Sequence, residues 1–177
     1  LLSHQHCDYT YLSASDDVGR NVLGIAVYRL LDATAPRSYR LIEKILNHPS
    51  SKPKLMLKPA TVRCSPLIAA IVNDEKTLFK LLLKSALIVS EFGDSHSGET
   101  TALIVAAQQK QFDYAIRLVN HKLCTPAYLS RVNNNNNSAL YYTALNNTPT
   151  ANKVAKLMIK KSKHHSALLL HRNNRAQ

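Results

Sequence analysis

The chain has few of the residues that several common architectures need. Of its 177 residues only 4 are glycine and none is tryptophan. Phosphate-binding loops and glycine-rich barrels use glycine for tight turns and close backbone approach, so both are disfavoured. No apolar run approaches the roughly 20 residues that span a bilayer, and no signal-peptide pattern opens the chain. Since 45% of the residues are hydrophobic, a core can still form, and helices are expected to build it.

Cysteine is also scarce. Cys7, Cys64 and Cys124 are odd in number, widely separated and in no CxxC pair. This pattern excludes a disulfide framework and a zinc site of the usual spacing. We therefore expect a reducing, intracellular and cytoplasmic setting, with no cofactor and no metal.

Acidic residues are missing from the last third. Residues 114 to 177 contain 10 Lys or Arg and no Asp or Glu, whereas residues 1 to 113 contain 13 Lys or Arg and 11 acids. The formal charge is +12. Such a charge attracts nucleic acid, an anionic membrane or an acidic protein.

One pattern recurs along the chain. TALIVAAQQ (101–109) places two adjacent alanines inside its most hydrophobic segment, and a second apolar run, FDYAIRLV, follows after a polar break. SPLIAAIVNDEKTLFKLLL (65–83) has the same order. NVLGIAVYRLL (21–31) and SALYYTALNN (138–147) are weaker copies, followed by YRLIEKIL and ANKVAKLMI. The equivalent leucines are 44, 36 and 37 residues apart: Leu23, Leu67, Leu103 and Leu140.

This order predicts stacked helix pairs. A helix pair cannot bury its apolar face alone, but stacking covers it if the inner helices approach closely. Small residues permit that approach: Ala69, Ala70, Ala106, Ala107, Ala26 and Ala144. The second helices carry an apolar stripe with the helical period: Leu78, Phe79, Leu81 and Leu82 in one, Val154, Leu157 and Met158 in another.

SPLIAAI and TALIVAA resemble the TPLHxAA motif of the ankyrin repeat family, whose period is about 33 residues. The usual His is absent from all four copies, and the usual Gly between the helices is Asp74 or Lys110. The resemblance implies an all-α ankyrin-repeat solenoid of stacked antiparallel helix pairs with inter-repeat loops over residues 1–163. Repeats are expected at about 16–50, 61–90, 94–124 and 134–163, after a remnant of a preceding repeat (1–15) and before a basic tail or partial cap (164–177). Loop tips are expected at 16–21, 94–100 and 133–137, and an extended or looped insertion at 49–59.

The resemblance also implies a non-catalytic protein-binding module that uses its concave surface. It is expected to be monomeric and to act either as a host-directed effector or as the targeting domain of a larger protein, with no small-molecule substrate. Tyr28 and Arg29 rank first because both residue types are enriched at binding hot spots. The alternative for Tyr28 is packing beneath the insertion 32–38, and Tyr141 and Tyr142 are expected in the core. The implied contact residues are Tyr28, Arg29, Arg63, Val72, Asn73, His96, Glu99, Gln108, Gln109, Leu145 and Asn146.

A second hypothesis uses the basic residues. Lysines follow helical spacing on several outer helices, so a basic strip could bind phospholipid headgroups, nucleic acid phosphates or an acidic partner. Aromatic residues for base stacking are absent there. The residues of this anionic surface are Lys153, Lys156, Lys160, Lys161 and Lys163.

Catalysis is the third hypothesis. His121 lies near Cys124, but sequence proximity alone does not activate a thiol. His4, His6, Cys7 and Asp8 can bind metals, yet no partner motif exists. We expect no catalytic residues.

Overall fold

The computed structural model describes residues 8–32, 38–56, 65–92 and 100–162. These residues form helices and turns, and their one β contact is an isolated bridge between Val132 and Ser138. The predicted all-α class is confirmed for this part of the chain. None of the helices described is both long and apolar enough to cross a membrane.

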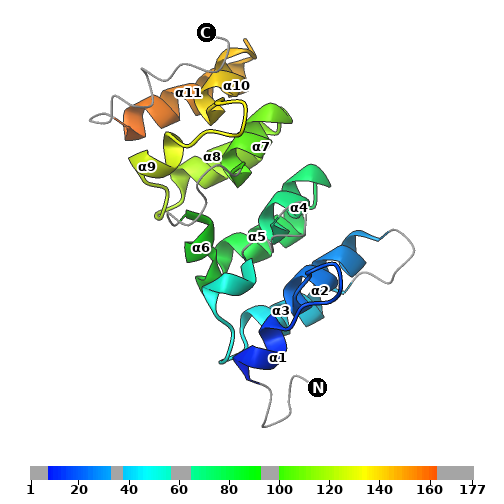
Figure 1. Cartoon of the computed structure of the whole chain (residues 1–177). Helices are drawn as coiled ribbons and strands as arrows, with labels where there is room; N and C mark the ends of the chain where they lie inside the picture. Colours follow the sequence, from blue (N-terminus) through cyan, green and yellow to red (C-terminus); the bar gives the residue numbers. More distant parts are fainter. Residues whose placement is uncertain (1–7, 33–37, 57–64, 93–99, 163–177) are drawn as a thin grey trace. The chain divides into compact units, whose positions relative to one another are not determined.

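The chain divides into two compact units, Leu1–Glu91 and Phe92–Gln177. In the first unit, α2 packs against α3 and α4 packs against α5; α2 also contacts α4, and α3 contacts α5 (Figure 1). Two helix pairs therefore stack within this unit. Its elements are α1 (Tyr9–Ser13), α2 (Val22–Leu31), α3 (Tyr39–Leu46), η1 (Pro53–Met56), α4 (Pro66–Val72), α5 (Lys76–Lys84), η2 (Ala86–Ile88) and α6 (Val89–Phe92), whose last residue belongs to the second unit.

The second unit repeats this arrangement. Helix α7 packs against α8 and α10, and α11 packs against α8 and α10. Its elements are α7 (Ala102–Gln108), α8 (Phe112–Asn120), α9 (Pro126–Leu129), α10 (Ala139–Ala144) and α11 (Pro149–Lys161). The short α9 was not expected, although Thr125 and Pro126 supply a helix-start signal.

Helices α2, α4, α7 and α10 correspond to the first helices of the four sequence copies and are called the inner helices. All four begin in the same way. The side chain of the N-cap residue accepts a hydrogen bond from the backbone N–H three residues later. Such a bond typically stabilises a helix by about 1 kcal/mol. These N-cap residues are buried, so each inner helix starts inside its unit: Asn21, Ser65, Thr101 and Ser138.

The small residues are also buried, with one correction. Ala26, Ala70 and Ala106 occupy equivalent positions, five residues after the N-cap, and all three are buried. In the fourth copy this position is Thr143, not the predicted Ala144, which is exposed. Thr143 is accommodated because its hydroxyl donates to the Leu140 carbonyl oxygen at 2.8 Å. Ala69, Leu81 and Leu157 are only half-buried, whereas the other predicted core positions are buried: Ala107, Leu78, Phe79, Leu82, Val154 and Met158.

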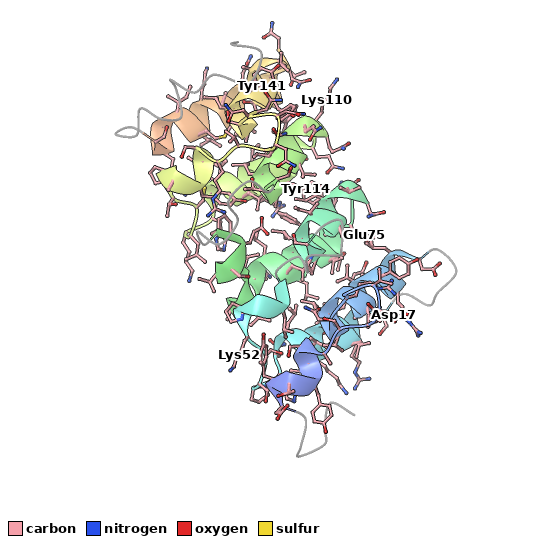
Figure 2. The ribbon with its side chains drawn as sticks, viewed as in Figure 1. Asp17, Lys52, Glu75, Lys110, Tyr114 and Tyr141 are labelled. Carbon is pink, nitrogen blue, oxygen red and sulfur yellow. The ribbon has the colours of Figure 1, made fainter. Side chains whose placement is uncertain are left out.

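In the two central helix pairs, α4–α5 and α7–α8, the turn between the two helices contains one residue in the left-handed region. Asp74 has φ 51° and Lys110 has φ 59°. After α7, the Lys110 N–H donates to Ala107 and the Gln111 N–H donates to Ala106. This is the Schellman arrangement, which usually places Gly at the left-handed position. Figure 2 shows Lys110 in this turn. The absence of Gly from both sites therefore leaves backbone strain in the fold.

The insertion at 49–59 differs from the expectation. Pro53–Met56 forms a 3₁₀ turn that packs against η2, and Leu55 is buried. The Leu55 carbonyl accepts a hydrogen bond from the Asn21 side-chain amide at 3.2 Å. Proline is tolerated here because the first residue of a helical turn needs no N–H partner.

Lys110→Gly is expected to raise the free energy of unfolding by about 0.5–1 kcal/mol, because glycine adopts the left-handed conformation without strain. Urea denaturation followed by circular dichroism measures the change. Gln109→Gly is the matched control, since φ is −80° at this neighbouring helix end, and we expect it to destabilise the fold. A destabilised Lys110→Gly variant would contradict the strain argument.

Candidate functional site

Large apolar side chains are exposed at the ends of the inner helices in the first unit. Tyr28 on α2 and Val72 on α4 are 59% and 52% exposed. They occupy equivalent positions on helices that contact each other, and Arg29 beside Tyr28 is exposed as well. The alternative that Tyr28 packs beneath the insertion stays a prediction, because residues 33–37 of the insertion lie outside the described residues.

Tyr28 is positioned by the preceding loop tip. The Arg20 guanidinium carbon lies 4.7 Å from the centre of the Tyr28 ring. Arg20 Nε also donates to Asp16 Oδ2 at 2.8 Å. The cation–π contact and the ion pair share one guanidinium, so Arg20 links the loop tip at 16–21 to the exposed Tyr28 ring.

The first tip is folded around the Asp16 carboxylate. Asp16 Oδ1 accepts from the backbone N–H groups of Arg20 at 2.7 Å and Val18 at 3.1 Å. The hydrogen bond from the Arg20 backbone and the Arg20 side chain hold the pKa of Asp16 below its usual value, despite the opposing desolvation. Gly19 supplies the positive φ, 79°, that closes the turn.

The second unit has a tip of the same design built from asparagine. Asn133 Oδ1 accepts from the backbone N–H groups of Asn135 and Asn137, both at 3.0 Å. Asn136 adopts φ 57° where the first tip has Gly19. The predicted loop at 133–137 is thus confirmed as an ordered turn. Most of the predicted tip at 94–100 lies outside the described residues.

Tyr142 connects this second tip to α10. Its hydroxyl accepts hydrogen bonds from Asn133 Nδ2 at 3.0 Å and Asn137 Nδ2 at 3.2 Å. The Tyr141 and Tyr142 rings meet edge to face, 5.4 Å apart. Both tyrosines are half-buried, so the prediction that they belong to the core is wrong. The reason is that the Tyr142 hydroxyl requires polar partners, which the asparagine tip provides.

The second unit also exposes the ends of its inner helices. Gln108 and Gln109 end α7 in solvent, and Leu145, directly after α10, is 63% exposed. Leu145 is equivalent in sequence to Tyr28 and Val72. Its helix packs against α7, so Gln108 and Leu145 occupy matching ends of two neighbouring helices.

Two predicted contact residues also have local roles. Asn73 Nδ2 donates to the Ala69 carbonyl at 2.9 Å, and Asn146 Nδ2 donates to the Tyr142 carbonyl at 2.8 Å. Each amide thereby satisfies a carbonyl at the end of an inner helix. The predicted contact residues Arg63, His96 and Glu99 lie outside the described residues.

The basic residues separate into two groups. Lys153, Lys156 and Lys160 are exposed on α11. Lys161 is half-buried, and its Nζ donates to the carbonyl oxygens of Val119 at 2.7 Å and His121 at 3.0 Å. Lys161 therefore caps the end of α8 and is removed from the predicted anionic surface. Lys163 lies outside the described residues.

An open groove of about 580 Å³ runs along the exposed side of α11. Its lining combines three exposed lysines with a proline and a half-buried leucine. The described lining residues are Pro149, Asn152, Lys153, Lys156, Leu157 and Lys160.

Cys124 and His121 do not form an activated nucleophile pair. Cys124 is buried, and this burial raises the pKa of its thiol to about 11, with only partial opposition from the Lys161 charge. His121 Nδ1 accepts the Leu123 N–H, and its ring stacks on Phe92 with the centroids 4.8 Å apart. A thiol that stays protonated at neutral pH is a poor nucleophile.

The metal-capable cluster at the start of the chain cannot be assessed as a site, since His4, His6 and Cys7 lie outside the described residues. Asp8 is described, and it accepts the Thr10 and Tyr11 N–H groups as the N-cap of α1. Among residues 8–32, 38–56, 65–92 and 100–162, no three His, Cys, Asp or Glu side chains gather as metal ligands would.

Arg20 was not predicted as a partner of Tyr28, and Asn152 and Leu157 were not predicted as groove residues. The tips did carry a signal. An Asp or Asn stands four residues before Arg20 and Asn137, and this spacing allows one side-chain oxygen to accept two backbone N–H groups.

The chain matches no protein-family model, no curated protein and no solved structure.

Asn133→Ala is expected to lower the free energy of unfolding of the second unit by about 1–2 kcal/mol, because two backbone N–H groups lose their acceptor and the Tyr142 hydroxyl loses one of its two donors. Asn134→Ala is the matched control, since Asn134 is exposed in the same turn, and should change stability by less than about 0.5 kcal/mol. Denaturant titration of both variants tests the tip. Equal free energies of unfolding for the two variants would contradict the proposed stabilising role of Asn133.

Iodoacetamide should alkylate folded Cys124 about 100-fold more slowly at pH 8 than the unfolded chain in urea, because the pKa rises from 9.0 to about 11. Mass spectrometry of the Cys124 peptide gives both rates. The folded rate should keep rising between pH 9 and 11, whereas the unfolded rate levels off. Equal rates at pH 8 would contradict the buried, protonated thiol.

Proposed function

We propose that the chain is a non-catalytic protein–protein interaction module, built as a degenerate ankyrin-type solenoid, that binds a partner protein through the exposed ends of its inner helices. The proposal concerns this chain only. A neighbouring domain of a larger protein could carry a catalytic activity.

Three repeated features support the ankyrin-type architecture. The four inner helices share the buried N-cap and the buried small residue five positions later. Asp74 and Lys110 adopt positive φ at the position where the ankyrin repeat has glycine. Helix pairs stack within each of the two units. An irregular helical bundle has no reason to repeat all three features.

One observation carries the binding proposal: equivalent positions at the ends of the inner helices expose apolar side chains. Tyr28, Val72 and Leu145 are each more than half exposed. Their helices are otherwise buried along the apolar face, so these side chains do not stabilise the core. Exposed apolar side chains at matching positions are typical of a surface that a partner covers.

The Arg20 contact strengthens the case for Tyr28. Interfaces gain most from aromatic and Arg side chains that are held in place before binding, because less conformational entropy is lost. Arg20 is fixed by Asp16 and lies over the Tyr28 ring. This pair is the proposed centre of binding in the first unit.

We further propose that the protein acts as a monomer in the cytoplasm, without a cofactor or small-molecule substrate. It would serve either as the targeting domain of a larger protein or as an effector inside a host cell. Both roles need a stable recognition surface and no chemistry of their own.

The test is quantitative capture of partners on the immobilised full chain, with mass spectrometry. The double variant Tyr28→Ser and Val72→Ser should lower recovery of the true partner at least tenfold, since hot-spot residues typically contribute about 2 kcal/mol or more. Leu145→Ser tests separately whether the inner-helix end of the second unit contributes to partner binding. Circular dichroism checks that each variant remains folded.

The matched control removes equally apolar residues from outer helices. Leu41 on α3 and Ile159 on α11 are 45% and 43% exposed, and Leu41→Ser with Ile159→Ser should leave the partner bound. A partner retained by the Tyr28 and Val72 variant, or lost equally by the control, would remove the inner-helix ends as the binding surface.

A further inference from the structure

A second surface, independent of the inner-helix ends, lies on α11. Lys153, Lys156 and Lys160 project from one exposed side of this helix, with sequence spacings of three and four residues, and line the same open groove. Between the first and last lysine the helix rises by roughly 10 Å. The three ammonium groups are therefore spread along the groove.

Within the described residues, these ammonium groups are not paired with a carboxylate. Residues 114 to 177 contain no Asp or Glu, and within the described residues none of the three lysines forms an ion pair. Like charges at this spacing repel one another. An anionic ligand would relieve that repulsion. Residues 163–177 also contain no Asp or Glu, so the side chains of this segment cannot supply the charge.

The groove also has an apolar part. Leu157 lies between the lysine positions and is half-buried, and Pro149 lines the groove near the start of α11. A ligand that fills about 580 Å³ can therefore place an apolar group against Leu157 and negative groups against the lysines. Asn152 adds an amide that can donate to, or accept from, a peptide backbone.

From this combination we infer that the α11 groove binds a short acidic peptide segment in which one apolar residue is flanked by Asp or Glu. The half-buried Leu157 between the lysine positions favours a peptide that carries an apolar side chain over the charged headgroups of a membrane surface. No aromatic residue is among the described lining residues, so the groove lacks the stacking platform that single-stranded nucleic acid uses. Lysine contributes point charges and needs no bidentate geometry, which suits a flexible carboxylate-rich chain.

The test uses the full chain and a fluorescently labelled peptide with one Leu between two pairs of Glu, followed by fluorescence anisotropy. Replacing all three groove lysines (Lys153→Gln, Lys156→Gln, Lys160→Gln) should weaken binding about tenfold, since each exposed pair contributes modestly. Binding should also fall as salt concentration rises.

The matched control is on α5, where Lys76, Lys80 and Lys84 are also exposed and regularly spaced. Changing these three to Gln removes the same net charge and should alter peptide affinity less than twofold. Similar losses in the two triple variants would show diffuse attraction by net charge and would overturn the groove assignment.

Leu157→Ala tests the apolar part separately. It should weaken the Leu-containing peptide about threefold or more, and should leave unchanged a control peptide in which Leu is replaced by Ser. A variant that binds the Leu peptide as tightly as the wild type would overturn the peptide-specific assignment. Circular dichroism identifies any loss of folding.

Two further ligands decide between chemical classes: vesicles containing phosphatidylserine and a single-stranded RNA of uniform sequence. The inference expects the groove variant to affect the peptide most. If the groove variant weakens vesicle or RNA binding but not peptide binding, the inference is wrong. Tyr28→Ser should leave the peptide affinity unchanged, so the outcome does not depend on the proposed function.

Discussion

Each inner helix depends on one hydrogen bond at its start, accepted by the side chain of a buried N-cap residue. The inner helices contain only 6 to 10 residues, and isolated helices of this length are unstable in water. The N-cap side chain fixes the first turn by accepting an N–H that would otherwise be buried without a partner. In the first repeat Asn21 has a second role, because its amide nitrogen donates to Leu55 and anchors the proline-rich insertion. The N-cap hydrogen bond sets the residue at which the helix starts. The position of the small residue and the direction of the helix end follow from that start.

The two loop tips show how different residues produce the same backbone. In one tip a carboxylate accepts two backbone N–H groups and pairs with an arginine that also covers Tyr28. In the other, an asparagine oxygen accepts the equivalent N–H groups while its amide nitrogen reaches Tyr142. Each tip thus joins a turn to an aromatic residue of the following inner helix. The loop and the helix are therefore positioned together.

Local features were predicted more successfully than contacts between distant residues. The helix Tyr39–Leu46 has the predicted boundaries, and the loop predicted at 133–137 is a turn. These depend on short-range capping and turn chemistry, which the sequence carries directly. Lys161 was misassigned because its acceptors, on Val119 and His121, are more than 35 residues away. Thr143 was overlooked because a hydroxyl that bonds within its own helix behaves like a small apolar residue, and composition alone does not show this.

The chemical difference between the tips has a consequence for their response to acid. The pKa of Asp16 is lowered in the folded state, so the stability that its carboxylate provides is present at neutral pH and is lost as the pH falls through that value. Protonation would weaken the hold on Arg20 and hence on Tyr28. The asparagine tip has no group that titrates in this range, so acid would leave its hydrogen bonds and the Tyr142 contact intact. One sequence difference at a shared position thus makes the first tip acid-sensitive and leaves the asparagine tip without a titrating carboxylate.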